Sequence, residues 1–323
     1  MRLVTFRKLK SRDIRIGIAL GDMVLDLREA LIDMISINYG LSEQDIVEWV
    51  YSFTSDMRRF IELLPITSDI VNKTIQLYSK TETQELLDRG LAYRTSDIKY
   101  LPAVHSPSKV IGIGLNYEDF RIMLKYPKPD VPLFFFKPIN TLVGHEDTVY
   151  IPRGGRWPGT ESKCLFHEYE MAIVIGRRAK NITRNDVYSY IFGVTIFSDI
   201  TAHDIEMMQP GFVLYQQRSK AFDTFSPVGP WIVTMDEIIE HGIDLHNLKI
   251  LRRRNGTVEG ESNTRNMIYK IPEIVEFLSE IMTLNPGDII SLGSPPGAPH
   301  CLQPSDVIEA EIEFIGILRN YIK

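Results

Sequence analysis

Two apolar segments near the middle of the chain carry carboxylates that a folded core must accommodate. If residues 166–175 form a strand, Glu168 and Glu170 share one face of it, because side chains alternate along a strand. Both faces of this segment continue with apolar residues, a pattern typical of a strand covered on both sides. A second apolar run, residues 190–197, leads to Asp199. The sequence therefore predicts a buried sheet with three acids at its margin.

Their burial restricts the kind of site that these three carboxylates can form. An isolated one costs several kcal/mol unless it is paired, protonated or bound to a metal. Three acids favour a metal site, and their oxygen ligands indicate Mg²⁺ or Mn²⁺ before Ca²⁺ and argue against zinc. Two alternatives remain: the acids sit at a wet strand end, or they form structural ion pairs with Arg177, Arg178 or Lys220.

Composition excludes several classes of protein. The 323 residues are 44% hydrophobic, enough for one large domain or two modest ones. A net charge of -6 gives no basic surplus for nucleic acid, and no segment approaches the roughly 20 apolar residues that span a membrane. The first residues lack the features of a signal peptide. We therefore expect a cytoplasmic protein that binds neither nucleic acid nor a membrane.

The two cysteines, Cys164 and Cys301, are far apart and lack the spacing of metal ligands. They are expected to be reduced thiols of an intracellular protein, with a disulfide as the alternative.

The pattern of elements divides the chain near residue 100. Residues 1–100 alternate short strands with helices expected at 41–64 and 70–87, as in a small α/β domain. A proline-punctuated stretch, 100–108, resembles a connection between domains. Residues 101–323 are rich in short strands, which favours a sandwich or barrel. These strands are expected at 110–113, 133–136, 148–151, 168–175, 191–197, 231–234, 248–254, 289–292 and 307–317.

Turn and helix signals add three local predictions. Asn255-Gly256 predicts a tight hairpin turn after the strand 248–254. Helices are expected at 184–190 and at 271–282, where Pro272 suits the first turn.

Four further motifs contain residues that could bind a ligand or take part in catalysis. Gly112-Ile113-Gly114 begins like a dinucleotide fingerprint, but Tyr117 takes the place of the third glycine, which argues against that fold. Lys137, Lys220 and Arg218 lie near aromatic residues, so each is either a positioned cation or a surface residue. The turn at 293–297 either brings backbone amides to a carboxylate or is only a tight turn. His145, His167 and His203 are isolated, which is more typical of structural histidines.

Together these segments closely resemble the fumarylacetoacetate hydrolase family, in order from about Lys109 to Asn320. The matching stretches are Gly114-Leu115-Asn116-Tyr117, Phe135-Phe136-Lys137-Pro138, Glu168-x-Glu170, residues 198–204, residues 220–230, Asn263-Thr264-x-x-Met267-Ile268, residues 286–290 and residues 293–297.

The resemblance implies an α+β, mostly β fold: a mixed β-sheet roll, barrel-like, at 101–323, joined to a small N-terminal α/β domain at 1–100. It implies a homodimer and a divalent ion held by Glu168, Glu170 and Asp199. Members act on 2-oxo acids or β-diketo acids. Their chemistry passes through an enolate that the ion stabilises.

The resemblance also implies roles for individual residues. Lys220 adds positive charge at the reacting centre, and Glu118, Asp119, His145 and His203 are the candidates for proton transfer. Thr264 would hold the substrate carboxylate. The local motifs add Asn116, Tyr117, Lys137, Arg218 and Ser294 as candidates for binding the substrate.

The sequence departs from the family pattern in two respects. The histidine and glutamate that activate water in the family's hydrolases and decarboxylases are replaced by Phe120 and Met123. His203 stands where the family commonly has arginine, which makes charge stabilisation weaker or dependent on pH.

The sequence leaves three functional hypotheses. The first is a metal-dependent enzyme for 2-oxo acids, with C–C bond hydrolysis ahead of sugar-acid dehydration, hydration, isomerisation or decarboxylation. The second is a metal-dependent 2-oxo-acid binding protein without catalysis. The third is that the acids are structural and bind no metal.

Overall fold

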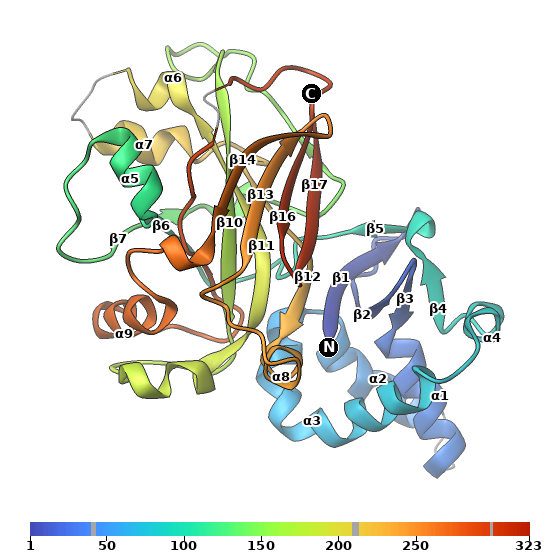
Figure 1. The fold of residues 1–323 in the computed structure, drawn as a ribbon. Helices are drawn as coiled ribbons and strands as arrows, with labels where there is room; N and C mark the ends of the chain where they lie inside the picture. Colours follow the sequence, from blue (N-terminus) through green and yellow to red (C-terminus); the bar gives the residue numbers. More distant parts are fainter. Residues whose placement is uncertain (40–42, 209–212, 298–299) are drawn as a thin grey trace.

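The computed structural model describes residues 1–39, 43–208, 213–297 and 300–323. The N-terminal part is a small antiparallel sheet with helices packed on one side of it (Figure 1). Its strands are β1 (Arg2–Lys8), β2 (Arg15–Leu20), β3 (Met23–Asp26), β4 (Ala92–Arg94) and β5 (Ile98–Tyr100). Its helices are α1 (Leu27–Tyr39), α2 (Glu43–Thr54), α3 (Met57–Tyr78) and α4 (Thr83–Asp88), with a 3-10 turn η1 (Thr95–Asp97).

The rest of the chain is dominated by strands, with short helices between them. The strands are β6 (Val110–Gly114), β7 (Leu133–Lys137), β8 (Leu142–Val143), β9 (Thr148–Val149), β10 (Leu165–Ile175), β11 (Ile191–Ala202), β12 (Ser226–Thr234), β13 (Lys249–Arg254), β14 (Thr257–Asn263), β15 (Ile289–Ser291), β16 (Val307–Ile312) and β17 (Gly316–Ile322). The helices are α5 (Glu118–Leu124), α6 (His203–Glu206), α7 (Val213–Ser219), α8 (Met235–Glu240) and α9 (Ile271–Ile281), and the 3-10 helices are η2 (Ile139–Thr141), η3 (Arg184–Tyr190) and η4 (Thr264–Asn266).

Within the described residues these strands form two open sheets rather than a closed barrel. The larger has 12 strands: ten follow the path β4-β3-β2-β1-β12-β11-β10-β15-β6-β7, while β5 pairs with β1 and β8 with β12. The smaller has five strands in the order β14-β13-β16-β17-β9. β1 pairs with β12, with Leu3 opposite Ile232, so the large sheet continues from the N-terminal part into the rest of the chain. The α+β class is confirmed, and the division near residue 100 stays a prediction.

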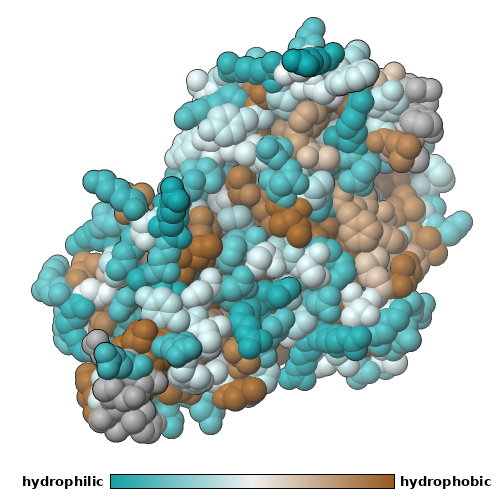
Figure 2. Space-filling view, turned by 180° about the vertical axis from the view of Figure 1, so that it is seen from behind, coloured by the Kyte–Doolittle hydropathy of each residue, from teal (hydrophilic) through white to brown (hydrophobic). Residues whose placement is uncertain are grey.

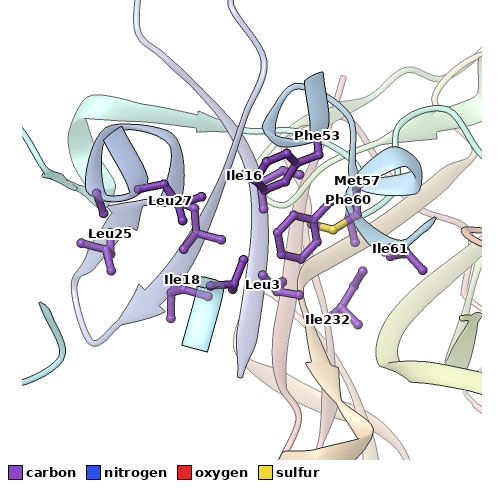
Figure 3. Packing of buried hydrophobic residues seen from close by; sticks show 14 of the residues in the cluster. Leu3, Ile16, Ile18, Leu25, Leu27, Phe53, Met57, Phe60, Ile61 and Ile232 are labelled. Atoms are coloured by element: carbon purple, nitrogen blue, oxygen red, sulfur yellow. The ribbon is translucent and has the colours of Figure 1, made fainter. Parts of the chain in front are cut away.

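The two faces of β10 contact different apolar cores. Met171 and Ile173 pack against residues of the smaller sheet, such as Ile250 and Ile312. Ala172 and Val174 belong to the other core, which reaches to the N-terminal helices. Figure 3 shows that core, where Met57 and Phe60 of α3 lie beside Leu3 of β1 and Ile232 of β12. Because Glu168 and Glu170 share the face of Ala172, they point away from the smaller sheet.

Several local predictions needed correction. The helix expected at 41–64 is two helices, because Asp56 caps α3 by accepting a hydrogen bond from the Arg59 amide; residues 41–42 lie outside the described part. α3 then continues through Pro65, so the break expected before residue 70 is wrong. The strand expected at 307–317 is two strands, β16 and β17, separated by a turn in which Phe314 has a φ of 66°.

Other local predictions are confirmed. Asn255 and Gly256 form the turn between β13 and β14, with φ angles of 52° and 78°. Residues 184–190 are helical in the 3-10 form, and α9 begins with Pro272 in its first turn. In the part of the chain that the structure describes, every helix is too short or too polar to cross a bilayer.

The expectation of two reduced cysteines is wrong, since Cys164 and Cys301 form a disulfide. Cys164 immediately precedes β10, and the chain after β15 returns to the same place, where the Leu302 amide donates to the Leu165 carbonyl at 2.9 Å. Residues 137 positions apart therefore become neighbours through the sheet.

Removal of this disulfide is expected to destabilise the fold. The bond closes a loop of more than one hundred residues, and the loss of a cross-link of this kind typically costs about 2–5 kcal/mol. Equilibrium denaturation of C164S/C301S should show this loss, and dithiothreitol should lower the wild-type midpoint but not that of the variant. An unchanged wild-type midpoint after full reduction would show that the bond contributes nothing to stability.

Candidate metal centre

Two neighbouring strands bring the three acids together. β10 and β11 are antiparallel, and their register places Glu168 directly opposite Asp199. Glu170 lies two residues further along β10 on the same face, as side-chain alternation requires. One carboxylate oxygen from each acid lies within 4.8 Å of the others. Glu170 and Asp199 are buried, while Glu168 is partly exposed.

Two buried lysines contact this cluster. The Lys220 Nζ donates to Asp199 Oδ2 at 2.7 Å, to Glu168 Oε1 at 3.1 Å and to Thr201 Oγ1 at 2.6 Å. The Lys137 Nζ donates to Asp199 Oδ1 at 2.7 Å and to the Phe225 carbonyl at 3.1 Å. Pairing with Lys220, one of the structural alternatives, is therefore present. Lys220 pairs with Asp199 and Glu168, but this pairing does not involve Glu170.

Glu170 has a different environment. Its carboxylate accepts hydrogen bonds from the Ser291 hydroxyl and, at 3.0 Å, from the Gly293 amide. Across the described residues, Glu170 forms no salt bridge. Burial, together with the charges of Asp199 and Glu168, raises its pKa to about 8. Glu170 is thus the carboxylate that the protein leaves without a cation.

The pKa values of the other ionisable groups in the cluster are shifted by burial and by the same neighbouring charges. Burial raises the pKa of Glu168, and Lys220 offsets this only in part. For Asp199 burial acts in the same direction, but Lys137 and Lys220 outweigh it, so its pKa is lowered. Burial lowers the pKa of Lys137, whereas the pKa of Lys220 is raised because Asp199 and Glu168 outweigh its own burial. Lys220 therefore stays charged at neutral pH.

This arrangement fits a divalent cation. With all three carboxylates ionised, the two ammonium groups leave one negative charge uncompensated, at Glu170, and the raised pKa of Glu170 reflects this lack of a cation. A donor set made only of carboxylate oxygens suits a hard ion such as Mg²⁺, Mn²⁺ or Ca²⁺. Glu168, Glu170 and Asp199 would hold such an ion. Their ligand role stays a prediction.

Three of the candidate residues lie in the loop after β6 and at the start of α5. Asn116 is buried, and its side chain bridges the backbones of Tyr269 and Leu292. Tyr117 is fully buried, and its hydroxyl has no hydrogen-bond partner among the described residues. Glu118 pairs with Arg121 in the first turn of α5. Their proposed roles remain untested.

Three more candidates have local partners elsewhere. Asp119 accepts hydrogen bonds from Ser262 and Asn266. The Thr264 hydroxyl accepts from the Leu248 amide, and the Ser294 hydroxyl donates to the Pro295 carbonyl.

The two candidate histidines lie in different parts of the fold. His203 opens α6, stacks on Phe166 with ring centroids 4.2 Å apart and lies 3.3 Å from Glu206. His145 lies elsewhere: burial and Arg319 lower its pKa to about 4, and it accepts from the Arg319 amide.

Arg218 belongs to α7, two residues before Lys220. It contacts Met208 and lies over the Tyr215 ring.

Two residues of the cluster, Thr201 and Ser291, were not singled out from the sequence. The Thr201 hydroxyl donates to Glu168 at 2.7 Å, and it lies two residues beyond Asp199 on the same face of β11. Alternation along the strand could have found it. Ser291 contacts Glu170 from β15, a contact that depends on the order of strands in the sheet. The Gly293 amide also reaches Glu170, so the turn at 293–297 does bring a backbone amide to a carboxylate.

Phe120 and Met123, which replace the family's histidine and glutamate, both lie on α5. Phe120 packs against the core between the sheets, and Met123 is 52% exposed. Neither side chain can transfer a proton. This helix therefore supplies no histidine–glutamate pair.

Comparison with known proteins identifies the family. Residues 109–323 match the family model described as the fumarylacetoacetate (FAA) hydrolase C-terminal domain. The chain belongs to the fumarylacetoacetate hydrolase family. Members of this family are enzymes, among them tautomerases, isomerases and hydrolases.

Individual relatives extend the comparison beyond the matched region. The mitochondrial oxaloacetate tautomerase fahd2 of Xenopus laevis is 32% identical over 328 residues, covering 99% of this chain and 89% of its own length. The protein MJ1656 of Methanocaldococcus jannaschii is 45% identical over 217 residues, covering 67% of this chain and 84% of its own. A solved maleylpyruvate hydrolase from Sphingobium sp. SYK-6, in complex with manganese(II) and pyruvate, is 27% identical, with a TM-score of 0.69 and coverage of 100% of this chain and 98% of its own.

Proposed function

We propose that this protein is a divalent-metal-dependent enzyme that interconverts the keto and enol forms of oxaloacetate or a closely related 2-oxo acid. The observation that carries the proposal is the buried cluster of Glu168, Glu170 and Asp199, whose carboxylates exceed the ammonium groups that face them by one charge. The Sphingobium hydrolase was solved in complex with manganese(II) and pyruvate, which supports a divalent metal and a 2-oxo acid as the ligands of this chain.

The residues of the cluster have separate parts in the proposed chemistry. A bound Mg²⁺ or Mn²⁺, with Ca²⁺ as the less suited ion, would supply a Lewis acid that stabilises negative charge on the 2-oxo oxygen. Lys220 adds a permanent positive charge beside it, fixed by three acceptors. Lys137 holds Asp199 in place from the opposite side.

Among the candidate reactions, tautomerisation requires the fewest catalytic groups from the remaining side chains. It needs a proton removed beside the 2-oxo group and returned to oxygen, and it needs no activated water. Phe120 and Met123 occupy the positions from which the family's hydrolases activate water. The likeness to the Xenopus oxaloacetate tautomerase spans almost the whole chain. Glu118, Asp119 and His203 are the proposed proton carriers.

C–C bond hydrolysis of an acylpyruvate is the second candidate. The full-length similarity to the Sphingobium maleylpyruvate hydrolase favours it. This reaction requires a base for water, which would have to come from Glu118 or Asp119 in the first turn of α5. Dehydration or decarboxylation of a 2-oxo acid, and binding without turnover, are the other outcomes that an assay must separate.

A homodimer and a cytoplasmic location belong to the same proposal. Exposed apolar side chains gather on α5, on β7, which ends the path of the large sheet, and in the segments beside them: Ile122, Met123, Leu124, Tyr126, Val131, Leu133, Phe136 and Ile139. This region is on the left of Figure 1, and brown and tan atoms gather on the corresponding side of the rear view in Figure 2. Light scattering should give the mass of two chains, and a monomer would contradict the dimer.

An assay of keto–enol exchange tests the proposed function directly. Purified protein with Mg²⁺ or Mn²⁺ should accelerate the disappearance of enol-oxaloacetate absorbance, and chelation by EDTA should abolish the effect. Acylpyruvates and 2-keto-3-deoxy sugar acids are run in parallel. Turnover of acylpyruvates alone would replace tautomerisation by hydrolysis, and binding without turnover of any compound would contradict an enzyme.

A further inference from the structure

Arg218 is a cation that no carboxylate among the described residues neutralises. It is half-buried near the end of α7, and none of the described carboxylates lies within 4.0 Å of its guanidinium. Its Nε is fully buried and lacks a hydrogen-bond partner among the described residues. Among the described residues, the one hydrogen-bond acceptor of its Nη2 is the Met208 sulfur, at 3.2 Å. Burying a guanidinium whose hydrogen-bond donors have no acceptor costs free energy, and a bound anion would remove this cost by accepting from them.

The surroundings hold this side chain in place. The guanidinium lies 4.6 Å from the centre of the Tyr215 ring. Gly159 approaches the guanidinium closely, since a Cβ added there would lie 2.3 Å from Arg218 Nη2. Gln217 fixes α7 to β7 by donating to the Phe136 carbonyl at 2.6 Å. Arg218 is therefore positioned, although it makes no ion pair.

Its location relates it to the carboxylate cluster. Lys220, whose ammonium contacts Glu168 and Asp199, is only two residues away, so the two α-carbons are at most about 7 Å apart. Met208 follows α6, and Glu206 of that helix acts electrostatically on both Glu168 and Lys220. The guanidinium thus lies on the side of the cluster that α6 and α7 cover.

The charges specify what kind of ligand would fit. Three carboxylates, two ammonium groups and a divalent ion sum to +1, which one substrate carboxylate neutralises. Arg218 adds a further positive charge that calls for a second carboxylate. Oxaloacetate and maleylpyruvate, named for two of the relatives, are both 2-oxo acids with a second carboxylate.

We propose that Arg218 binds the second carboxylate of the substrate, so that the site selects 2-oxo dicarboxylates over 2-oxo monocarboxylates. This rests on the proposed function only in placing a 2-oxo acid at the carboxylate cluster. Arg218 is a specificity-determining residue, and it takes no part in proton transfer. Arginine suits this task because its fork of donors matches a carboxylate in two hydrogen bonds.

A pair of five-carbon probes tests the proposal by binding alone. In the presence of Mg²⁺, calorimetry compares 2-oxoglutarate, which has two carboxylates, with 2-oxopentanoate, which has one. The wild type should bind 2-oxoglutarate at least about 10-fold more tightly, as expected for charge-assisted hydrogen bonds. R218Q should lose about 10- to 100-fold in affinity for 2-oxoglutarate and change less than about 2-fold for 2-oxopentanoate. R218K should recover only part of the loss.

Two controls separate specificity from folding and from the reaction. Arg177→Gln removes an arginine just beyond the opposite end of β10 and should leave both affinities unchanged. Thermal midpoints of all variants report whether they fold. No preference in the wild type, or equal weakening of both probes by R218Q, would overturn the proposal. If the probes discriminate through Arg218 but no 2-oxo acid is turned over, the proposed function fails and the role of Arg218 stands.

Discussion

Replacing Glu170 by glutamine is expected to remove divalent-ion binding while leaving the metal-free protein folded. Glutamine keeps the shape of the side chain and an oxygen that can accept from Ser291 and Gly293, but it removes the charge that has no cationic partner. Without the ion, activity should fall by at least about 10²- to 10³-fold in kcat/KM. Calorimetric titration with Mn²⁺ and the oxaloacetate assay measure the two effects.

The same substitution should change how stability depends on pH. In the metal-free protein the pKa of Glu170 is raised to about 8 from an ordinary value of 4.5, so between these values the folded state holds a proton that the unfolded state has lost. Stability contributed by this group is therefore present below pH 4.5 and falls as the pH rises toward 8. The E170Q variant has no carboxyl group to ionise at this position, so its stability should not fall in this way. At pH 8 it should be more stable than the metal-free wild type by on the order of a few kcal/mol.

Denaturation of both proteins in EDTA at pH 5 and pH 8 measures this difference. Glu261→Gln is a matched control, since Glu261 is an exposed acid paired with Lys249 at 3.0 Å. It should bind Mn²⁺ like the wild type and show no change in pH dependence. A metal-free E170Q that is less stable than the wild type at pH 8 would mean that the Glu170 charge is already compensated.

Replacing Lys220 by methionine is expected to damage both stability and activity. The substitution removes the ammonium that contacts Asp199 and Glu168, and it leaves Glu168 without its cation. Breaking a buried ion pair by removing one partner typically costs about 3–5 kcal/mol. The loss of a fixed positive charge at the reacting centre should lower kcat by about 10²- to 10³-fold. Urea denaturation and steady-state kinetics give the two quantities.

Lys249→Met provides the comparison for this experiment. Lys249 pairs with Glu261 at the surface, where an ion pair contributes at most about 1 kcal/mol. Mn²⁺ should restore part of the stability lost in K220M, because the ion compensates the same carboxylates. A K220M protein with wild-type stability and turnover would show that Lys220 has neither role.

The part of the site that follows from one strand could be predicted from the sequence. Alternation along 166–175 placed Glu168 and Glu170 on one face, and the apolar run before Asp199 indicated a neighbouring buried strand. The register of β10 and β11 then sets Asp199 opposite Glu168. Local signals also sufficed for the Asn255-Gly256 turn, because a two-residue turn depends on those residues alone.

Contacts that depend on the order of strands were beyond the reach of local patterns. Ser291 meets Glu170 because β15 lies next to β10, and Cys301 meets Cys164 because the chain returns past the start of that strand. The start of α3 was missed for a different reason. Asp56 ends one helical pattern and caps the next, while the apolar spacing on either side continues without interruption.

The most direct test of the account is the anomalous scattering of a crystal of the protein soaked in Mn²⁺. We expect a single strong peak bounded by Glu168, Glu170 and Asp199, with at least one oxygen of each acid at coordination distance, and we expect the peak to be absent from E170Q. A wild-type crystal without that peak, in Mn²⁺ that saturates the activity, would contradict the central claim that these carboxylates are gathered around a divalent ion.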